Sequence, residues 1–167
     1  MYKLKAGTPG SKVLKAIHIF CITLWIGGLL TWVPLTTTMP LKDIAATQIT
    51  YLNLRSIAWN VIGWGGIGSF VTGLLNGLLT SWGLFKHTWI KTKLILTIVM
   101  ILFGMFYTEQ KMLSNIRLLD SGNSKVLETS LFLANHGAIQ AVVPIQLAVF
   151  FVIVLISVFK PWMKSDI

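Results

Sequence analysis

Residues 138–159 read AIQAVVPIQLAVFFVIVLISVF, an apolar run without a charged residue. The run is long enough to cross the hydrocarbon core of a bilayer as a helix, which takes about 20 residues. Its apolar residues are continuous rather than alternating, which favours a helix over a membrane β-strand. Three further apolar stretches lie at residues 16–35, 57–79 and 94–107. The sequence therefore predicts an all-α integral membrane protein, a bundle of four transmembrane helices.

The composition agrees with a membrane protein. Of the 167 residues, 54% are hydrophobic and 11% are charged, whereas soluble domains carry about a quarter charged residues. The same composition excludes intrinsic disorder. The single cysteine, Cys21, excludes an intramolecular disulfide framework and a cysteine-based zinc site. We expect one domain over residues 1–167, with spans at about 14–36, 56–80, 88–109 and 137–160.

The charges are divided unequally between the two sides that four spans define. The side that holds both termini carries nine lysines and one aspartate, whereas the opposite side carries five basic and four acidic residues. The positive-inside rule therefore predicts a plasma-membrane protein with both termini in the cytoplasm. The net charge of +9 is then an orientation signal at the lipid bilayer. Nucleic-acid binding is not expected, since no basic recognition module accompanies the charge.

The third apolar stretch, residues 94–107, is too short to span the membrane by itself, at about 21 Å. Residues 120–124 read DSGNS, a strong turn signal. We therefore expect helices over about 88–119 and 125–160. Both exceed the hydrocarbon thickness of about 30 Å, so these two helices are expected to extend past the membrane on the outer side.

One face of the first helix combines a histidine with a thiol and aromatic rings. Cys21 and Trp25 follow His18 at helical spacing, and Gly28 and Trp32 continue the same face. Such a face suits contact with a flat ligand. The alternative is a seam that packs against another helix, with the histidine hydrogen-bonded to a neighbour.

The second helix has a face of small residues, which are Gly65, Ser69, Gly73 and Gly77. Small side chains allow a helix backbone or a planar ring to approach closely. Asn76 lies near one end of this helix, where its amide can hydrogen-bond to a neighbouring helix.

Lys93 lies several residues inside the third span. An ionisable residue within a bilayer is costly, so it is a functional candidate, although a lysine can also extend to the lipid phosphates. His18 and Lys93 are expected at a similar depth below the cytoplasmic surface of the membrane, so both can face one cavity. His87 lies on the same side of the membrane but closer to its surface. A pair of His18 and His87 is the histidine pair available for a metal. His136 begins the fourth span at the opposite side.

Three motifs carry a resemblance to a known family. KAIHIFCITLWIGGLLTWVPL at 15–35, WIKTKL at 89–94 and VFKPW at 158–162 resemble the first helix, the third helix and the C-terminal end of HemJ-type protoporphyrinogen oxidases. The first of them is also similar to the first helix of CopD-type copper-resistance membrane domains. The matches follow the same order along all four spans.

The resemblance implies a b-type haem bound through His18, with Lys93 as a functional, catalytic residue. It further implies an oxidoreductase that oxidises a porphyrin precursor and passes electrons to a quinone or another membrane acceptor. Leu35 and Lys91 stand where family members carry an arginine and a histidine, so haem binding transfers more directly than oxidase activity. The candidate cofactor-binding residues are His18, Cys21, Trp25, Gly73, Asn76, His87 and Lys93.

Two other functions remain open at this point. A copper-handling module would use His18 and Cys21 together with methionines, since soft sulfur ligands suit Cu(I). A non-catalytic scaffold, as a homo-oligomer or a subunit of a larger membrane complex, would need only the small-residue face and the aromatic residues.

Overall fold

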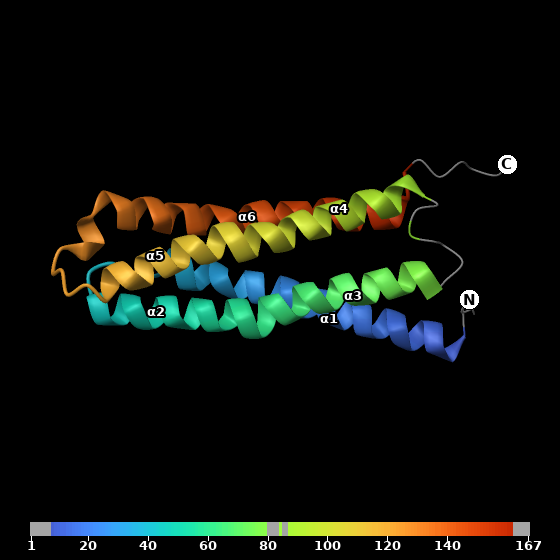
Figure 1. The fold of residues 1–167 in the computed structure, drawn as a ribbon, viewed down its shortest axis with the longest axis horizontal. Helices are drawn as coiled ribbons and strands as arrows, with labels where there is room; N and C mark the ends of the chain where they lie inside the picture. Colours follow the sequence, from blue (N-terminus) through green and yellow to red (C-terminus); the bar gives the residue numbers. More distant parts are fainter. Residues whose placement is uncertain (1–7, 80–83, 85–86, 162–167) are drawn as a thin grey trace.

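The computed structural model describes residues 8–79, 84 and 87–161, and these residues form a helical bundle without strands (Figure 1). Four continuous helical segments in it are long and apolar enough to cross a membrane. This confirms the prediction of an all-α protein with four helices of transmembrane length. Part of the charge count lies outside the described residues, at Lys3, Lys5, Lys86, Lys164 and Asp166, as does residue 80 at the end of the second expected span.

The first and second segments contain the elements α1 to α3. Helix α1 covers Pro9–Thr37, and a proline suits its first position because that N–H has no helical partner. The second segment consists of α2 (Ile44–Ile57), the π-helical turn η1 (Ala58–Gly63) and α3 (Trp64–Leu79). It begins well before the expected span, because Asp43 caps α2 by accepting a hydrogen bond from the Ala46 N–H at 3.1 Å.

The third segment runs over residues 88–119, as expected. It consists of α4 (Thr88–Leu102), the π-helical turn η2 (Phe103–Thr108) and α5 (Glu109–Leu119). The fourth helix, α6 (Ser130–Phe159), begins five residues later than position 125. A short 3₁₀ turn, η3 (Val126–Glu128), precedes it, because the Asn123 side chain accepts from the Lys125 N–H at 2.9 Å and holds a turn there.

The helices run alternately along one axis, so that α1 begins and α6 ends at the same end of the bundle (Figure 1). Helix α3 lies against α1, and α5 lies against α6 and α2. The outer surface carries large exposed apolar side chains, among them Trp64, Phe106 and Phe159, which are 65% exposed or more. Apolar surface on this scale is what a lipid-facing bundle presents.

A buried polar cluster holds the opposite end together. The Asn115 amide donates to the Tyr51 hydroxyl at 2.8 Å, and this hydroxyl lies 2.9 Å from Nδ1 of His136. The Asn135 amide donates to the Asn115 side-chain oxygen at 3.0 Å. The cluster connects α2, α5 and α6, and every member is 5% exposed or less.

Candidate functional site

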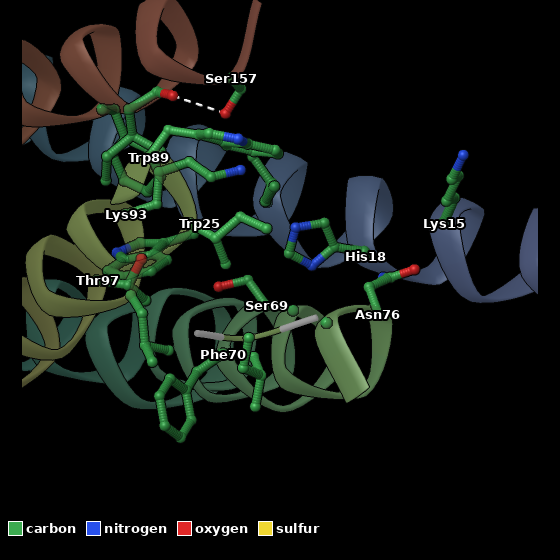
Figure 2. Close-up of a pocket in the computed structure, with 18 residues that line it drawn as sticks. Lys15, His18, Trp25, Ser69, Phe70, Asn76, Trp89, Lys93, Thr97 and Ser157 are labelled. Atoms are coloured by element: carbon green, nitrogen blue, oxygen red, sulfur yellow. Dashed lines mark hydrogen bonds between the residues drawn. The ribbon is translucent and has the colours of Figure 1, made fainter. Parts of the chain in front are cut away.

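A cavity of about 310 Å³ opens between α1, α3, α4 and α6, close to the end where α1 begins. Figure 2 shows His18 of α1 beside Ser69 and Asn76 of α3, with Lys93 of α4 reaching toward the same space. Aromatic and aliphatic side chains form most of the wall. This volume lies at the lower end of the range for small-molecule sites, about 300–1,000 Å³.

The His18 ring is fixed by α3, through the Thr72 hydroxyl and the backbone of Ser69. Nδ1 of His18 lies 2.9 Å from the Thr72 hydroxyl oxygen, and that hydroxyl donates to the Gly68 carbonyl at 2.6 Å. A hydroxyl has one hydrogen, and the shorter contact assigns it to the Gly68 carbonyl. We therefore assign Thr72 as the acceptor from His18, with the ring hydrogen on Nδ1. Nε2, the other ring nitrogen, then holds a lone pair. In Figure 2 the ring nitrogen of His18 that lies farther from α3 is turned toward the centre of the cavity. The arrangement resembles that of metal-binding histidines, in which the second nitrogen is held by a hydrogen bond.

Lys93 is the basic side chain deepest in this cavity. Its Nζ lies 4.5 Å from the centroid of the Trp89 ring, in a cation–π contact. Lys15 also lines the cavity but is exposed. Figure 2 places Lys15 and Asn76 on one side of His18 and Lys93 on the other. The cavity therefore offers an imidazole nitrogen and an amine within a largely apolar wall.

The small-residue face of α3 explains how the space arises. A Cβ on Gly65 would lie 2.5 Å from the Trp25 backbone nitrogen, so the two backbones touch there. A Cβ on Gly73 would lie 3.2 Å from Cε1 of His18, so the missing side chain makes room for the imidazole. The face thus packs on α1 at one position and accommodates the histidine at another.

The other candidates from the sequence lie in different surroundings. Trp25, Gly73 and Asn76 line the cavity, whereas Cys21 and His87 are not among its lining residues. Cys21 packs against α3, where a Cβ on Gly68 would lie 2.7 Å from its sulfur. His87 precedes α4 and stacks on Trp89, with the ring centroids 6.3 Å apart.

His136 belongs to the polar cluster at the opposite end, where Tyr51 is its partner. It does not line the His18 cavity. Within residues 8–79, 84 and 87–161, no three side chains of the His, Cys, Asp and Glu types gather closely enough to hold a metal ion.

A second cavity, of about 350 Å³, lies farther along the bundle. Trp25 forms part of the wall of both cavities. Gln146, which follows Pro144 in α6, lines this second cavity, whereas the Gln140 amide donates to the Thr36 carbonyl at 2.9 Å.

Sequence reasoning missed Thr72 and Thr108, because a single threonine in an apolar helix gives no signal until the facing helix is known.

Comparisons with protein-family models, with characterised proteins and with solved structures found no match to the chain.

Proposed function

We propose that the chain is a multi-pass plasma-membrane protein that binds a b-type haem through Nε2 of His18. The observation that carries the proposal is the hydrogen bond from Nδ1–H of His18 to Thr72, which leaves Nε2 as the free lone pair at the cavity. A porphyrin supplies its own ring nitrogens to the iron, so one or two protein ligands are sufficient. The haem would bring one-electron chemistry into a site of low dielectric constant.

The chemistry of the surrounding residues suits such a group, whose size would require the lining side chains to move apart from their positions around the cavity of about 310 Å³. The aromatic rings of Trp25, Trp89 and Phe150 give the cavity flat apolar walls, and Gly73 leaves space beside the imidazole. Lys93 supplies a second polar contact. Its amine would either ligate the iron, when deprotonated, or pair with a carboxylate of the porphyrin edge.

The orientation belongs to the same proposal. The lysine-rich side supports an orientation with both termini in the cytoplasm, in which the haem cavity would lie near the inner leaflet. The lengths of the third and fourth segments support a hairpin that extends past the membrane on the outer side.

The redox activity extends the proposal one step further. The motifs at 15–35, 89–94 and 158–162 support an oxidoreductase of the protoporphyrinogen oxidase type, with a quinone or another membrane molecule as electron acceptor. Because Leu35 replaces the arginine of that family, haem binding is the part to test first.

An absorbance spectrum of the detergent-purified protein, oxidised and then reduced, tests haem binding directly. We expect a Soret band that is lost in His18→Ala and recovered when imidazole is added to this variant. His87→Ala is the matched control, and we expect it to keep the band. Lys93→Met should shift the band if the amine binds iron, whereas Lys91→Met should not, because Lys91 is exposed on the same helix.

Other results would contradict the proposal. A protein produced with ample haem that stays colourless, or a Soret band that persists in His18→Ala without a shift, would rule out His18 as the ligand. Stoichiometric copper without porphyrin would favour the copper-handling alternative. A colourless, metal-free protein that co-purifies with a larger complex would favour a scaffold.

A further inference from the structure

The second cavity contains hydrogen-bond donors that the protein itself does not use. Trp32 and Thr108 line this cavity. The Trp32 indole N–H and the Thr108 hydroxyl are buried, and neither has a hydrogen-bond partner among the described residues. Trp32 is 2% exposed and Thr108 is 4% exposed. Buried polar groups are normally paired, so two unpaired donors on one cavity wall indicate an acceptor that comes from outside the chain.

Thr108 differs from several other helical threonines of this protein. Thr31, Thr50 and Thr92 each donate to the carbonyl four residues earlier, at distances between 2.8 and 3.1 Å. Thr108 closes the π-helical turn η2, in which the carbonyl positions differ from those of an α-helix. The hydroxyl is therefore left without a hydrogen-bond partner among the described residues.

Two π-helical turns meet at this cavity. Residues of η1 in the second segment and of η2 in the third line its wall. Such turns are rare, and they occur frequently at functional sites. Their coincidence around one space is a second observation, independent of the unpaired donors.

The remaining lining residues indicate that the body of the ligand is apolar. Most lining residues are apolar, and Glu109, the acidic one, is already paired with Arg55 at 2.8 Å. Trp64 and Met105 line the cavity and are 68% and 44% exposed, so its edge faces the surroundings of the bundle through apolar side chains. In a membrane these surroundings are lipid, so an apolar molecule can enter from the bilayer.

We propose that this cavity binds a bilayer-soluble molecule whose apolar body carries a carbonyl oxygen, and that this oxygen accepts hydrogen bonds from Trp32 and Thr108. A ring carbonyl of a quinone and an ester carbonyl of a lipid acyl chain share this chemistry. The site differs from the haem cavity, with Trp25 as the residue common to both walls. It does not depend on haem binding.

Saturable quenching of tryptophan fluorescence tests the proposal on the purified full-length chain. One arm titrates a short-chain alkyl benzoquinone, and the other titrates a phospholipid with brominated acyl chains. Thr108→Val removes one hydroxyl without changing the side-chain shape, and we expect it to weaken binding about fivefold to tenfold, the effect of one hydrogen bond. Thr92→Val is the matched control, because its hydroxyl is bonded within α4, and we expect it to bind as the wild type does.

The two arms identify the source of the carbonyl. Saturation by the quinone alone assigns a quinone, saturation by the lipid alone assigns a lipid, and either result supports the site if Thr108→Val weakens it. Trp32→Phe provides the second variant and should weaken the same ligand. The proposal is overturned if neither probe saturates, or if Thr108→Val and Trp32→Phe bind like Thr92→Val. Repeating the titration in His18→Ala separates this outcome from the haem proposal, since we expect the second cavity to keep its ligand there.

Discussion

Replacing Gly65 with alanine tests the helix contact on which the haem cavity depends. The new Cβ would lie 2.5 Å from the Trp25 backbone nitrogen and 2.9 Å from the Cys21 carbonyl oxygen. Ordinary contacts begin at 3.4 Å, so α1 and α3 would have to separate by about 1 Å. Both neighbours are backbone atoms and cannot rotate away. We expect this overpacking to cost about 1–3 kcal/mol in the free energy of unfolding.

Gly27→Ala is the matched control, because nothing lies within 4 Å of a Cβ at that position of α1. Both substitutions gain about 1 kcal/mol in helix propensity, so the difference between the variants isolates the clash. Gly68→Ala should fall between them, since its Cβ would meet the Cys21 sulfur at 2.7 Å and a side chain can move. Unfolding in mixed detergent micelles, followed by circular dichroism, measures the order. If Gly65→Ala is as stable as Gly27→Ala, the close approach of α1 and α3 is wrong.

Two further predictions concern hydrogen bonds. Thr72→Val removes the Thr72 acceptor for Nδ1–H of His18. We expect haem affinity to fall about 10- to 100-fold, as for other groups that hold a metal-binding histidine. A Soret titration measures the loss, and an unchanged affinity would contradict the orienting role of Thr72. Asn115→Ala removes three buried hydrogen bonds, those of Asn115 with the Tyr51 hydroxyl, the Phe132 carbonyl and the Asn135 amide, so the free energy of unfolding should drop by about 1–3 kcal/mol. Denaturation of the purified variant checks this, with Asn53→Ala at an exposed position of α2 as the control.

The four helices could be predicted from hydropathy because a bilayer imposes a minimum length on every apolar segment. The near-helical spacing of Leu41, Ile44, Ala45 and Leu52 predicts that the second helix begins well outside the membrane, and the structure confirms this with α2 (Ile44–Ile57). Its first residue is set by the Asp43 cap. The late start of α6 depends on a side-chain bond of Asn123. Each of these boundaries is set by a local hydrogen bond that hydropathy does not register.

The candidate site was only partly accessible from the sequence. His18 and Lys93 could be assigned to a common depth, because depth follows from position along a helix. Thr72 could not be assigned as the partner of His18, because rotation of α3 relative to α1 is set by packing. The same holds for Trp32 and Thr108, whose missing partners become visible only when the cavity around them is known.

The small residues of α3 presented two alternatives in the sequence, a helix-packing face or a face for a flat ligand. In the structure each alternative applies at a different position along the face. At Gly65 a Cβ would strike the α1 backbone, whereas at Gly73 it would reach the His18 ring at 3.2 Å. Close packing at the first position brings α3 near α1, and this allows Thr72 to reach Nδ1 of His18. The packing contact and the proposed ligand site therefore depend on each other: a substitution that pushes the helices apart at Gly65 should also disturb the imidazole at Gly73.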